Sequence, residues 1–220
     1  MDRFNTYPSR ESAGEVLADL LDMLDIANPY LIAIPRGGIQ VAEAIADKLR
    51  VPINPIIVKK LPIPENPEAG FGAITADGTK VLDEETVNYL RLSEDQINRI
   101  SEKVVQEIKH RLEAYGSITP DHVKGADAIV VDDGAATGYS TIAALKSIKN
   151  MQPKSLIAAL PVSSGEAYSK ISKIADTTIC PKVESTYFFA VGNYYDEWYD
   201  LSEEQIKGIL KAYRDKYGNK

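Results

Sequence analysis

Short apolar runs alternate with amphipathic stretches along most of the chain. Apolar residues dominate positions 30–34, 53–58, 128–131 and 155–160. Such short continuous runs are typical of strands that are buried on both faces of a parallel sheet. Between the first two runs, apolar residues recur at the spacing of one helical face across positions 42–49. Strand, helix and strand within about 30 residues form a βαβ unit, so the pattern predicts an α/β fold with a doubly wound parallel sheet.

A serine followed three residues later by Glu or Gln marks the predicted starts of several helices. In this pairing the two side chains satisfy backbone N–H groups that have no partner in the first helical turn. The pattern occurs at Ser12 with Glu15, at Ser93 with Gln96 and at Ser163 with Glu166, and a further capped helix is expected from Ser202 onward. We therefore predict helices over residues 12–26 and 93–115, the second ending at Gly116. A further helix over about 140–149 is expected within a second βαβ unit that begins at residue 128.

Two segments interrupt the alternation of strands and helices. Residues 61–82 are rich in proline, and Asp77 with Gly78 separates two β-like runs, which is a hairpin signal. A long excursion from a parallel sheet is often a flexible loop that covers a binding site. Residues from about 184 to 220 carry aromatic side chains and then the last helix. We predict one domain over residues 1–220, with the hairpin insertion and an aromatic, hood-like C-terminal piece.

Composition and charge narrow the functional classes. The chain has 220 residues, of which 44% are hydrophobic and 26% charged, and its net charge is −7. An acidic surface repels a phosphate backbone, so we expect no nucleic-acid partner, whereas a small phosphate ester needs only a few local donors. Cys180 is the single cysteine, and His110 and His122 have no neighbours at metal-ligand spacing. No apolar run approaches the roughly 20 residues that span a bilayer, and without an apolar leader we expect a cytoplasmic location.

The strongest chemical signal is the sequence IVVDDGAATGYST at residues 129–141. Its apolar start places Asp132 and Asp133 at the carboxyl end of a strand, where ligands of open α/β sheets bind. The small residues that follow let backbone N–H groups approach a ligand, and the next helix adds the positive end of its dipole. A phosphate monoester fits such a loop, and two carboxylates suit the vicinal hydroxyls of a ribose, directly or through a metal ion. We call residues 132–141 the signature loop.

Other interpretations of the signature loop explain fewer of its residues. A Walker A loop needs a lysine where this chain has Tyr139, and the spacing of a dinucleotide-binding glycine motif is absent. The plain alternative is a tight strand-to-helix turn in which Asp133 caps the helix. The acidic pair, the small residues and the hydroxyl side chains occur together, which favours a ligand site.

The segment VVDDGAATGYST resembles the phosphoribosyl-diphosphate signature of type I phosphoribosyltransferases. The resemblance implies that Asp132 and Asp133 contact the ribose hydroxyls of phosphoribosyl diphosphate (PRPP). It also implies that the 5′-phosphate is bound by Ala135, Ala136, Thr137, Gly138, Tyr139 and Ser140. VKKLPIPENPEAGFGAI at residues 58–74 resembles the second-strand end and flexible loop of a predicted-phosphoribosyltransferase subgroup. The segment from Tyr187 to Gly192 is similar to the PFFAVG-type tails of that subgroup.

The sequence IPRGG at residues 34–38 resembles the diphosphate loop of the same family. Arg36 offers fork-shaped donors for a diphosphate. Gly37 and Gly38 tolerate unusual backbone angles that would expose consecutive N–H groups to an anion. The family often has a cis peptide bond in this loop, which would be Pro35–Arg36 here. The alternative is a strand-to-helix turn with a surface arginine.

Lys59 and Lys60 follow the second apolar run at the same expected edge of the sheet. By the period of two in a strand, one of them should face the ligand, and the pattern leaves open which one. A solvated lysine pair is the alternative. The resemblance implies diphosphate binding by Arg36, Gly37, Gly38, Lys59 and Lys60.

The family resemblance implies a glycosyltransferase of the pentosyltransferase class. Such an enzyme moves 5-phosphoribosyl from PRPP to a nitrogen acceptor, here expected to be a nucleobase, and releases diphosphate. The implied catalytic residues are Arg36, Lys60, Asp132 and Asp133, which hold the donor and the leaving group, so no side chain need act as a nucleophile. Mg²⁺ is expected to arrive with PRPP, with Asp132 or Asp133 as its protein contact. We also expect a homodimer and a role in nucleotide metabolism.

One residue departs from the purine-salvage members of the family. Those members usually have an aspartate three places after the second acid of the pair, near N7 of the base, and this chain has Ala136 there. Uracil-type members also lack that acid, so the departure concerns the acceptor and not the sugar site. Two other functions stay open, namely a non-catalytic sensor of PRPP or a nucleotide, and a hydrolase of another ribose phosphate. Arg36 with its glycine pair favours a ligand that carries a diphosphate.

The aromatic residues of the C-terminal piece have two interpretations. Phe188 and Phe189 could stack on a flat acceptor base, although adjacent aromatic residues more often fill a core and its edge. The remaining ones, which predict packing or a subunit contact, are Tyr194, Tyr195, Trp198 and Tyr199.

Overall fold

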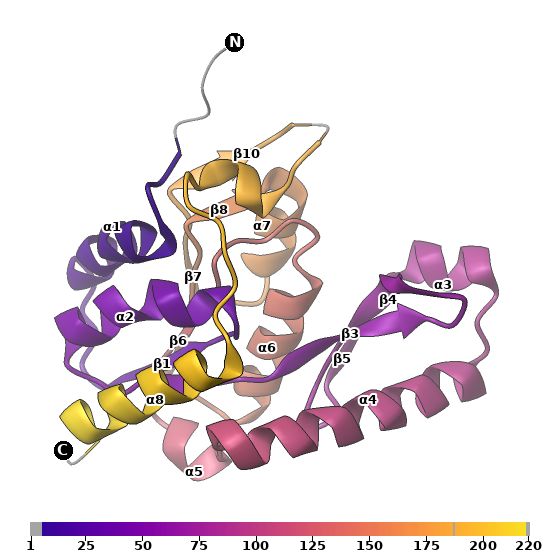
Figure 1. Ribbon diagram of the computed structural model, residues 1–220, viewed down its shortest axis with the longest axis horizontal. Helices are drawn as coiled ribbons and strands as arrows, with labels where there is room; N and C mark the ends of the chain where they lie inside the picture. The colour runs from indigo at the N-terminus through magenta and orange to yellow at the C-terminus, as the bar shows by residue number, and fades with distance from the viewer. Residues whose placement is uncertain (1–5, 187, 219–220) are drawn as a thin grey trace.

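A five-stranded parallel sheet forms the centre of the molecule (Figure 1). The computed structural model describes residues 6–186 and 188–218. In spatial order the strands are β2 (Asn54–Pro55), β1 (Pro29–Ala33), β6 (Asp127–Val131), β7 (Ser155–Ala159) and β9 (Thr177–Ile179). All neighbouring pairs in this sheet run parallel. The parallel sheet predicted from the apolar runs is therefore confirmed.

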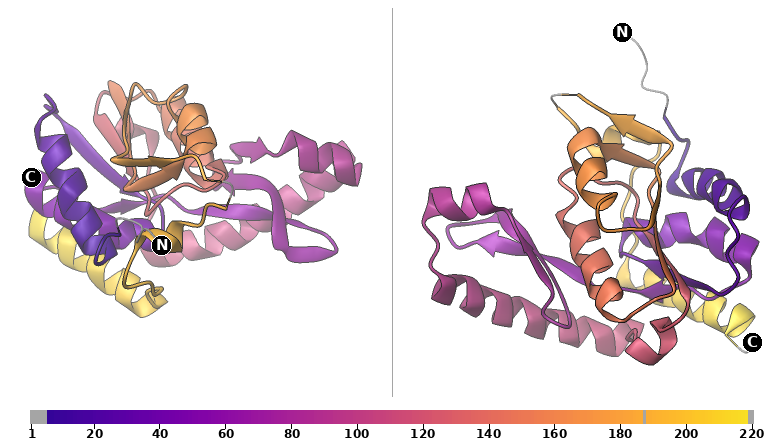
Figure 2. Two further views of the ribbon diagram at one scale, coloured as in Figure 1. Left: turned by 90° about the horizontal axis from the view of Figure 1, so that it is seen from above. Right: turned by 180° about the vertical axis from the view of Figure 1, so that it is seen from behind.

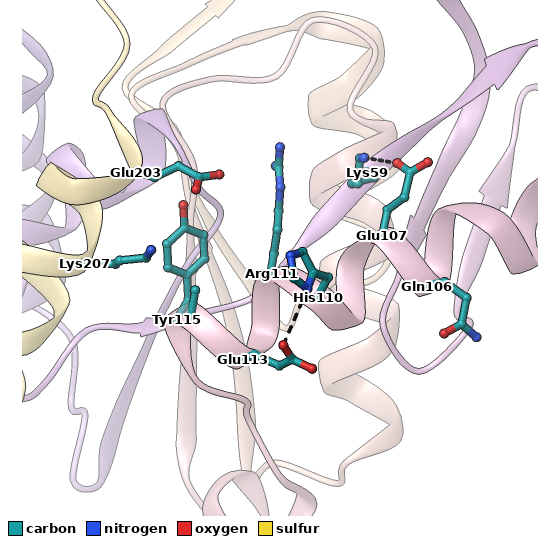
Figure 3. Close-up of a pocket in the computed structure, with 10 residues that line it drawn as sticks. Lys59, Gln106, Glu107, His110, Arg111, Glu113, Tyr115, Glu203 and Lys207 are labelled. Carbon is teal, nitrogen blue, oxygen red and sulfur yellow. Dashed lines mark hydrogen bonds and ion pairs between the residues drawn. The ribbon is translucent and has the colours of Figure 1, made fainter.

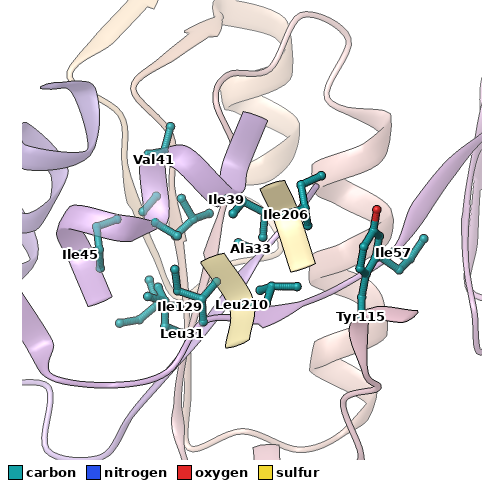
Figure 4. Packing of buried hydrophobic residues seen from close by; sticks show 14 of the residues in the cluster. Leu31, Ala33, Ile39, Val41, Ile45, Ile57, Tyr115, Ile129, Ile206 and Leu210 are labelled. Atoms are coloured by element: carbon teal, nitrogen blue, oxygen red, sulfur yellow. The ribbon is translucent and has the colours of Figure 1, made fainter. Parts of the chain in front are cut away.

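Successive residues of a strand face opposite sides of the sheet, and each side has its own apolar core. Leu31 and Ala33 belong to one cluster, whereas Ile32 between them belongs to the other. Figure 4 shows the first cluster, in which Leu31 packs with Ile45 and Leu210 from two covering helices. The first face is covered by α1 (Arg10–Asp22), α2 (Gly37–Leu49) and α8 (Glu203–Tyr217), and the second by α6 (Tyr139–Asn150) and α7 (Gly165–Ile171) (Figure 2). The sheet is thus doubly wound, as predicted. Separately, no helix in the described parts of the chain is long and apolar enough to cross a membrane.

Two of the predicted helix caps are wrong by one turn or one residue. Ser9 caps α1, because its backbone is extended and its hydroxyl accepts from the Ser12 N–H at 3.3 Å. Ser12 already lies inside the helix and cannot take the extended conformation of a cap. Similarly, Ser164 caps α7 and accepts from the Ala167 N–H at 3.1 Å. Ser163 is instead fully buried in the strand β8 (Val162–Ser164). Its hydroxyl lies 3.3 Å from the carbonyl oxygen of Ala135.

Residues 58–115 form an arm whose far end extends away from the sheet in every view (Figure 1, Figure 2). Its antiparallel strands are β3 (Val58–Ile63), β4 (Asn66–Thr75) and β5 (Lys80–Leu82), and its helices are α3 (Glu84–Leu90) and α4 (Glu94–Tyr115). The predicted capping box at Ser93 is confirmed. The predicted hairpin at Asp77 and Gly78 is confirmed between β4 and β5, where Gly78 has a φ of 85°. A short helix, α5 (Pro120–Val123), leads from the arm to β6.

The apolar run at residues 53–58 does not form a single strand. Its parallel part, β2, has only 2 residues, and Val58 already pairs antiparallel with β4. The Ile56 N–H still donates to the Ala33 carbonyl at 3.0 Å, after which the chain leaves the parallel sheet. Lys59 and Lys60 therefore lie in β3 of the arm, and the prediction that they end a parallel strand was wrong.

The start of the described chain packs against the C-terminal piece. The Tyr7 N–H donates to the Tyr194 carbonyl at 2.8 Å, and the rings of Tyr7 and Tyr195 lie 5.8 Å apart. This region also contains β10 (Lys182–Glu184), which pairs with β8, and η1 (Val191–Tyr194). The helix α8 that follows has its predicted cap at Ser202. The packing predicted for the tyrosines at positions 194 and 195 is confirmed, whereas Tyr187 lies outside the described residues.

Candidate active site

The two loops indicated by the sequence meet at one edge of the central sheet. β1 lies between β2 and β6, so the strand order reverses direction at this point. Ligands of open α/β sheets bind in the crevice that such a reversal leaves beyond the carboxyl ends of the strands. Residues 35–38, which we call the Arg36 loop, follow β1, and the signature loop follows β6. The Ile34 N–H donates to the Val131 carbonyl at 2.9 Å, which holds the starts of the two loops side by side.

The signature loop surrounds a hollow of about 220 Å³ at the start of α6. Gly138 precedes the helix with a φ of 78°, a conformation that favours glycine, and no side chain caps the helix. The first N–H groups of α6 therefore have no capping side chain, and the helix dipole favours an anion in front of them. The hollow is lined by Asp132, Gly134, Ala135, Ala136, Thr137, Gly138, Tyr139, Ser140, Thr141 and Val191. All six residues predicted for the 5′-phosphate are in this lining.

Hydrogen bonds from β8 hold the backbone of the signature loop. The Ala135 N–H donates to the Val162 carbonyl at 3.0 Å, and the Ser164 N–H donates to the Ala135 carbonyl at 2.9 Å. The two serine hydroxyls add to this pairing, since Ser163 Oγ lies 3.3 Å from the Ala135 oxygen and Ser164 Oγ lies 2.6 Å from the Ala136 oxygen. Both carbonyls thus have partners in β8. The sequence gives no local signal for these contacts, because the partners are 28 residues apart.

Asp132 is held by the loop that it introduces. Its Oδ1 accepts from the Asp133 N–H at 3.0 Å, and its Oδ2 accepts from the Thr141 hydroxyl at 3.3 Å. Burial raises the pKa of Asp132 well above that of an ordinary aspartate, and the neighbouring Asp133 raises it further. The carboxyl group is therefore fixed in orientation, and it is electrostatically costly to ionise in the absence of a ligand.

Asp133 is tied to an arginine that sequence reasoning did not single out. Nε and Nη2 of Arg10 each lie 2.8 Å from Oδ2 of Asp133, whose side chain is 16% exposed. Burial raises the pKa of Asp133, and the Arg10 guanidinium opposes that rise. The two residues are 123 positions apart, so no spacing rule could join them. Asp133 is therefore a largely buried carboxylate that is paired with a buried cation.

The Arg36 loop has the predicted cis peptide bond at Pro35–Arg36. Its glycines, however, are required by close approach and not by unusual backbone angles. A Cβ at Gly37 would lie 1.9 Å from Oδ2 of Asp133, and one at Gly38 would lie 2.8 Å from the Val131 carbonyl oxygen. Both glycines lie at the start of α2. The Gly38 N–H already donates to the Ile34 carbonyl at 3.1 Å. The Gly38 N–H is therefore not free for an anion, and the prediction of two consecutive exposed N–H groups is wrong at Gly38.

Arg36 itself is exposed at the crevice. Its Nη1 donates to the Leu201 carbonyl at 3.1 Å, which links the Arg36 loop to the start of the C-terminal helix. The other guanidinium N–H groups have no hydrogen bond or ion pair with the described residues. A planar guanidinium with unused donors suits a phosphate group.

The two lysines of β3 point to different surroundings. Lys59 forms an ion pair with Glu107 of α4, in a groove of about 840 Å³ between α4 and α8 (Figure 3). Arg111 points into the same groove between Lys59 and Tyr115 (Figure 3). The Lys60 amine instead donates to the Glu68 carbonyl across the hairpin of the arm. The structure does not bring either lysine into hydrogen bonds with the Arg36 loop or the signature loop among the described residues.

Comparison with known proteins identifies the family of the chain. The family model described as a phosphoribosyl transferase domain matches residues 8–198. The chain belongs to this family. A Mycobacterium tuberculosis protein named as a candidate phosphoribosyl transferase, Rv0571c, is 30% identical over 212 residues, which are 95% of this chain and 47% of that protein. The chain thus spans about half the length of the curated relatives it matches.

A solved structure of similar size extends the likeness to the fold. TT1426 from Thermus thermophilus is 31% identical to this phosphoribosyl transferase domain, with a TM-score of 0.77. The match covers 94% of this chain and 99% of TT1426, so it includes the arm and the C-terminal piece as well as the sheet. The family resemblance inferred from the signature loop is confirmed.

Ala136 is the position at which this phosphoribosyl transferase domain departs from the purine-salvage members. The residue is exposed, and its methyl group replaces the expected carboxylate at the rim of the hollow. It also lines a second groove of about 770 Å³, on the outer side of the signature loop, with Asp83, Glu166 and Lys170. The acidic side chains that share a lining with Ala136 are thus Asp132 in the hollow and Asp83, Glu84, Glu85 and Glu166 in the groove.

Proposed function

We propose that this domain transfers the 5-phosphoribosyl group of PRPP to a nitrogen acceptor and releases diphosphate. The observation that carries the proposal is the meeting of the signature loop and the Arg36 loop around one acidic pair at the reversal of the strand order. PRPP has a phosphate at one end of its ribose and a diphosphate at the other, so its two ends match the two loops. A monophosphate would need only one of them.

The signature loop is assigned the 5′-phosphate and the ribose. The hollow at the start of α6 offers backbone N–H groups and the hydroxyls of Thr137 and Ser140 to the phosphate oxygens. Asp132 and Asp133 lie between this hollow and the Arg36 loop, which is the position of the ribose in a donor that spans both. Carboxylates accept hydrogen bonds from hydroxyl groups, so the pair fixes the ring and with it the carbon that reacts.

The Arg36 loop is assigned the departing diphosphate. Its guanidinium would bind phosphate oxygens on which charge develops as the bond to carbon 1 breaks. Lys59 and Lys60 lie on the arm, and we propose that they reach the diphosphate when the arm covers the site. Closure of the arm would also exclude water, which otherwise competes with the acceptor for the donor.

The acidic pair suits a metal ion that arrives with the donor. The described residues contain no group of three or more His, Cys, Asp or Glu side chains that could hold a metal ion by themselves. Mg²⁺ commonly binds through one or two carboxylates together with phosphate oxygens of the substrate. Asp132 or Asp133 would supply the protein contact, and the ion would neutralise charge on the diphosphate.

The acceptor is proposed to be a nucleobase other than hypoxanthine or guanine. A purine acceptor must lose a proton, and general-base help of about 10²- to 10⁴-fold is unavailable at Ala136. Ala136→Asp should raise purine turnover only if the pocket already admits the ring. Efficient turnover of hypoxanthine or guanine by the unmodified protein would overturn this assignment of the acceptor and leave the donor site as proposed.

The transfer reaction is tested by incubating the protein with PRPP, Mg²⁺ and a panel of nucleobases, and measuring diphosphate release. We expect release that requires both PRPP and one class of base, with formation of the matching nucleoside monophosphate. Calorimetry on the same sample measures PRPP binding separately. Tight binding without release for every base would contradict transfer and favour a sensor. An Asp132→Asn variant is the matched control for release that does not come from this site.

A further inference from the structure

Arg10 is buried beside Asp133, where α1, the Arg36 loop and the C-terminal piece come together. Its side chain is 3% exposed, although it carries a permanent charge. Both contacts of hydrogen-bond length with Asp133 fall on one oxygen, Oδ2. Two donors on a single oxygen fix the rotation of the carboxyl group, so Arg10 determines how Asp133 presents itself to the crevice.

The other contacts of Arg10 fix the guanidinium in turn. Its carbon Cζ lies 3.8 Å from the centre of the Trp198 ring, and Nη1 donates to Gln40 Oε1 at 3.3 Å and to the Tyr199 carbonyl. The carboxylate of Asp200 lies 4.0 Å from Nη2. α2 and the C-terminal piece therefore both hold the arginine in one place. Because the guanidinium has this many protein partners, its position is fixed by contacts within the fold.

The Arg36 loop is packed directly on this ion pair. A Cβ at Gly37 would lie 1.9 Å from Asp133 Oδ2 and 2.8 Å from Arg10 Nε. In addition, the Tyr195 hydroxyl donates to the Asp133 carbonyl at 2.5 Å, so the backbone of this residue is held as well as its side chain. The orientation of Asp133 is thus set by groups that lie behind the crevice.

We propose that Arg10 is a positioning residue for the ribose of the donor and acts through Asp133. It holds the Asp133 carboxylate in the orientation that accepts the ribose hydroxyls, and it does not itself touch the donor because it lies behind the carboxylate. The inference rests on the proposed function only in taking the ligand of Asp133 to be a ribose phosphate. It adds the N-terminal helix and Trp198 to the parts of the chain on which sugar binding depends.

The test compares a ligand that has ribose hydroxyls with one that lacks them. Calorimetry with ribose 5-phosphate and with inorganic diphosphate is carried out on the wild type, on Arg10→Gln and on Arg10→Lys. We expect Arg10→Gln to weaken ribose 5-phosphate binding about 10- to 100-fold, because hydrogen bonds to a positioned carboxylate are lost. Diphosphate binding should change less than about 3-fold, and Arg10→Lys should recover part of the loss. Arg99→Gln, at an exposed position of α4, is the charge-matched control.

A double-mutant cycle with Asp133→Asn separates positioning from general support of the fold. If Arg10 acts through Asp133, Arg10→Gln should weaken ribose 5-phosphate binding no further in the Asp133→Asn background. Full additivity, or equal losses for ribose 5-phosphate and diphosphate, would overturn the inference. If Arg10→Gln does not fold, the same comparison is made with Arg10→Lys, which keeps the charge and loses the paired donors. A wild type that binds ribose 5-phosphate without releasing diphosphate from PRPP would contradict the proposed reaction and leave the role of Arg10 intact.

Discussion

The acidic pair and the arm are held in opposite ways. Around Asp133, the partners come from the first helix and from the C-terminal piece and are buried, as the contacts of Arg10 and Tyr195 show. In the arm, ion pairs and hydrogen bonds such as Lys59 with Glu107 form at the surface between neighbouring elements. When a buried contact loses one partner, the remaining polar group has neither that partner nor water to bond with. At the surface, water replaces the lost partner. The comparison indicates a donor site whose polar contacts lie in the interior and an arm whose polar contacts are cheap to break, while apolar side chains such as Phe71 and Ile74 keep the arm packed in the first apolar cluster.

The largest difference between the two regions should appear when Asp133 is removed. Asp133→Ala leaves the buried guanidinium of Arg10 without its main partner, and we expect the free energy of unfolding to fall by about 3–5 kcal/mol. Urea denaturation measures the loss. Asp121→Ala, at an exposed position of α5, is the control and should change stability by less than about 0.5 kcal/mol. Equal small losses for both variants would mean that the Arg10–Asp133 pair does not stabilise the fold.

Arg36→Ala should separate the two loops of the donor site. The side chain is exposed, so we expect little change in stability and a loss of about 1.5–3 kcal/mol in PRPP and diphosphate binding, roughly 10- to 100-fold. A nucleoside monophosphate, which uses only the signature loop, should bind almost as before. Calorimetry with the three ligands measures the difference. Equal losses for the monophosphate would show that Arg36 has no separate contact with the diphosphate.

Two glycine substitutions contrast a packed position with an open one. Gly37→Ala drives a methyl group into the Arg10–Asp133 pair and should lower the free energy of unfolding by about 1–3 kcal/mol. Gly208→Ala, in α8, meets nothing within 4 Å and should raise it by about 0.5–1 kcal/mol, because alanine favours a helix. Thermal denaturation of both variants gives the signs. A stabilising Gly37→Ala would contradict the close packing of the Arg36 loop on the acidic pair.

The smallest effect is expected in the arm. The hydrogen bond from Lys59 lowers the pKa of Glu107, so the pair stabilises the fold above the ordinary pKa of glutamate and loses this contribution as the pH falls. Glu107→Gln should therefore lower the free energy of unfolding by about 0.2–1 kcal/mol near pH 7. The difference from wild type should shrink once the pH falls below the ordinary glutamate pKa of about 4.3, and it should vanish below the lowered pKa of Glu107. Urea denaturation at neutral and at low pH measures it, and a constant difference would assign the effect to something other than the ion pair.

Much of the fold could be predicted because it depends on local patterns. The apolar runs at residues 30–34 and 128–131 gave strands, since a strand buried on both faces has no polar positions. The capping box at Ser93 gave the start of α4, and Asp77 with Gly78 gave a turn. Each of these signals lies within a few residues, so the chain alone is sufficient to find it.

The errors and omissions arose where distant contacts decide the outcome. Ser163 has the sequence of a cap, but its pairing with the signature loop places it in a strand. Lys59 and Lys60 were assigned to a parallel strand because nothing local shows that the pairing with β1 ends before Val58 and that β3 pairs with β4 instead. Arg10 was missed, since its partner lies 123 residues away, although it contacts a residue that the signature loop did identify.

Amide hydrogen exchange with and without PRPP and Mg²⁺ tests the central claim most directly, because it reports on both loops at once. We predict that PRPP protects the amides of the signature loop and of the Arg36 loop, and that ribose 5-phosphate protects those of the signature loop alone. The buried strands beneath should change little with either ligand. Protection confined to the groove between α4 and α8, or equal protection of both loops by ribose 5-phosphate, would contradict a single donor site built from the two loops.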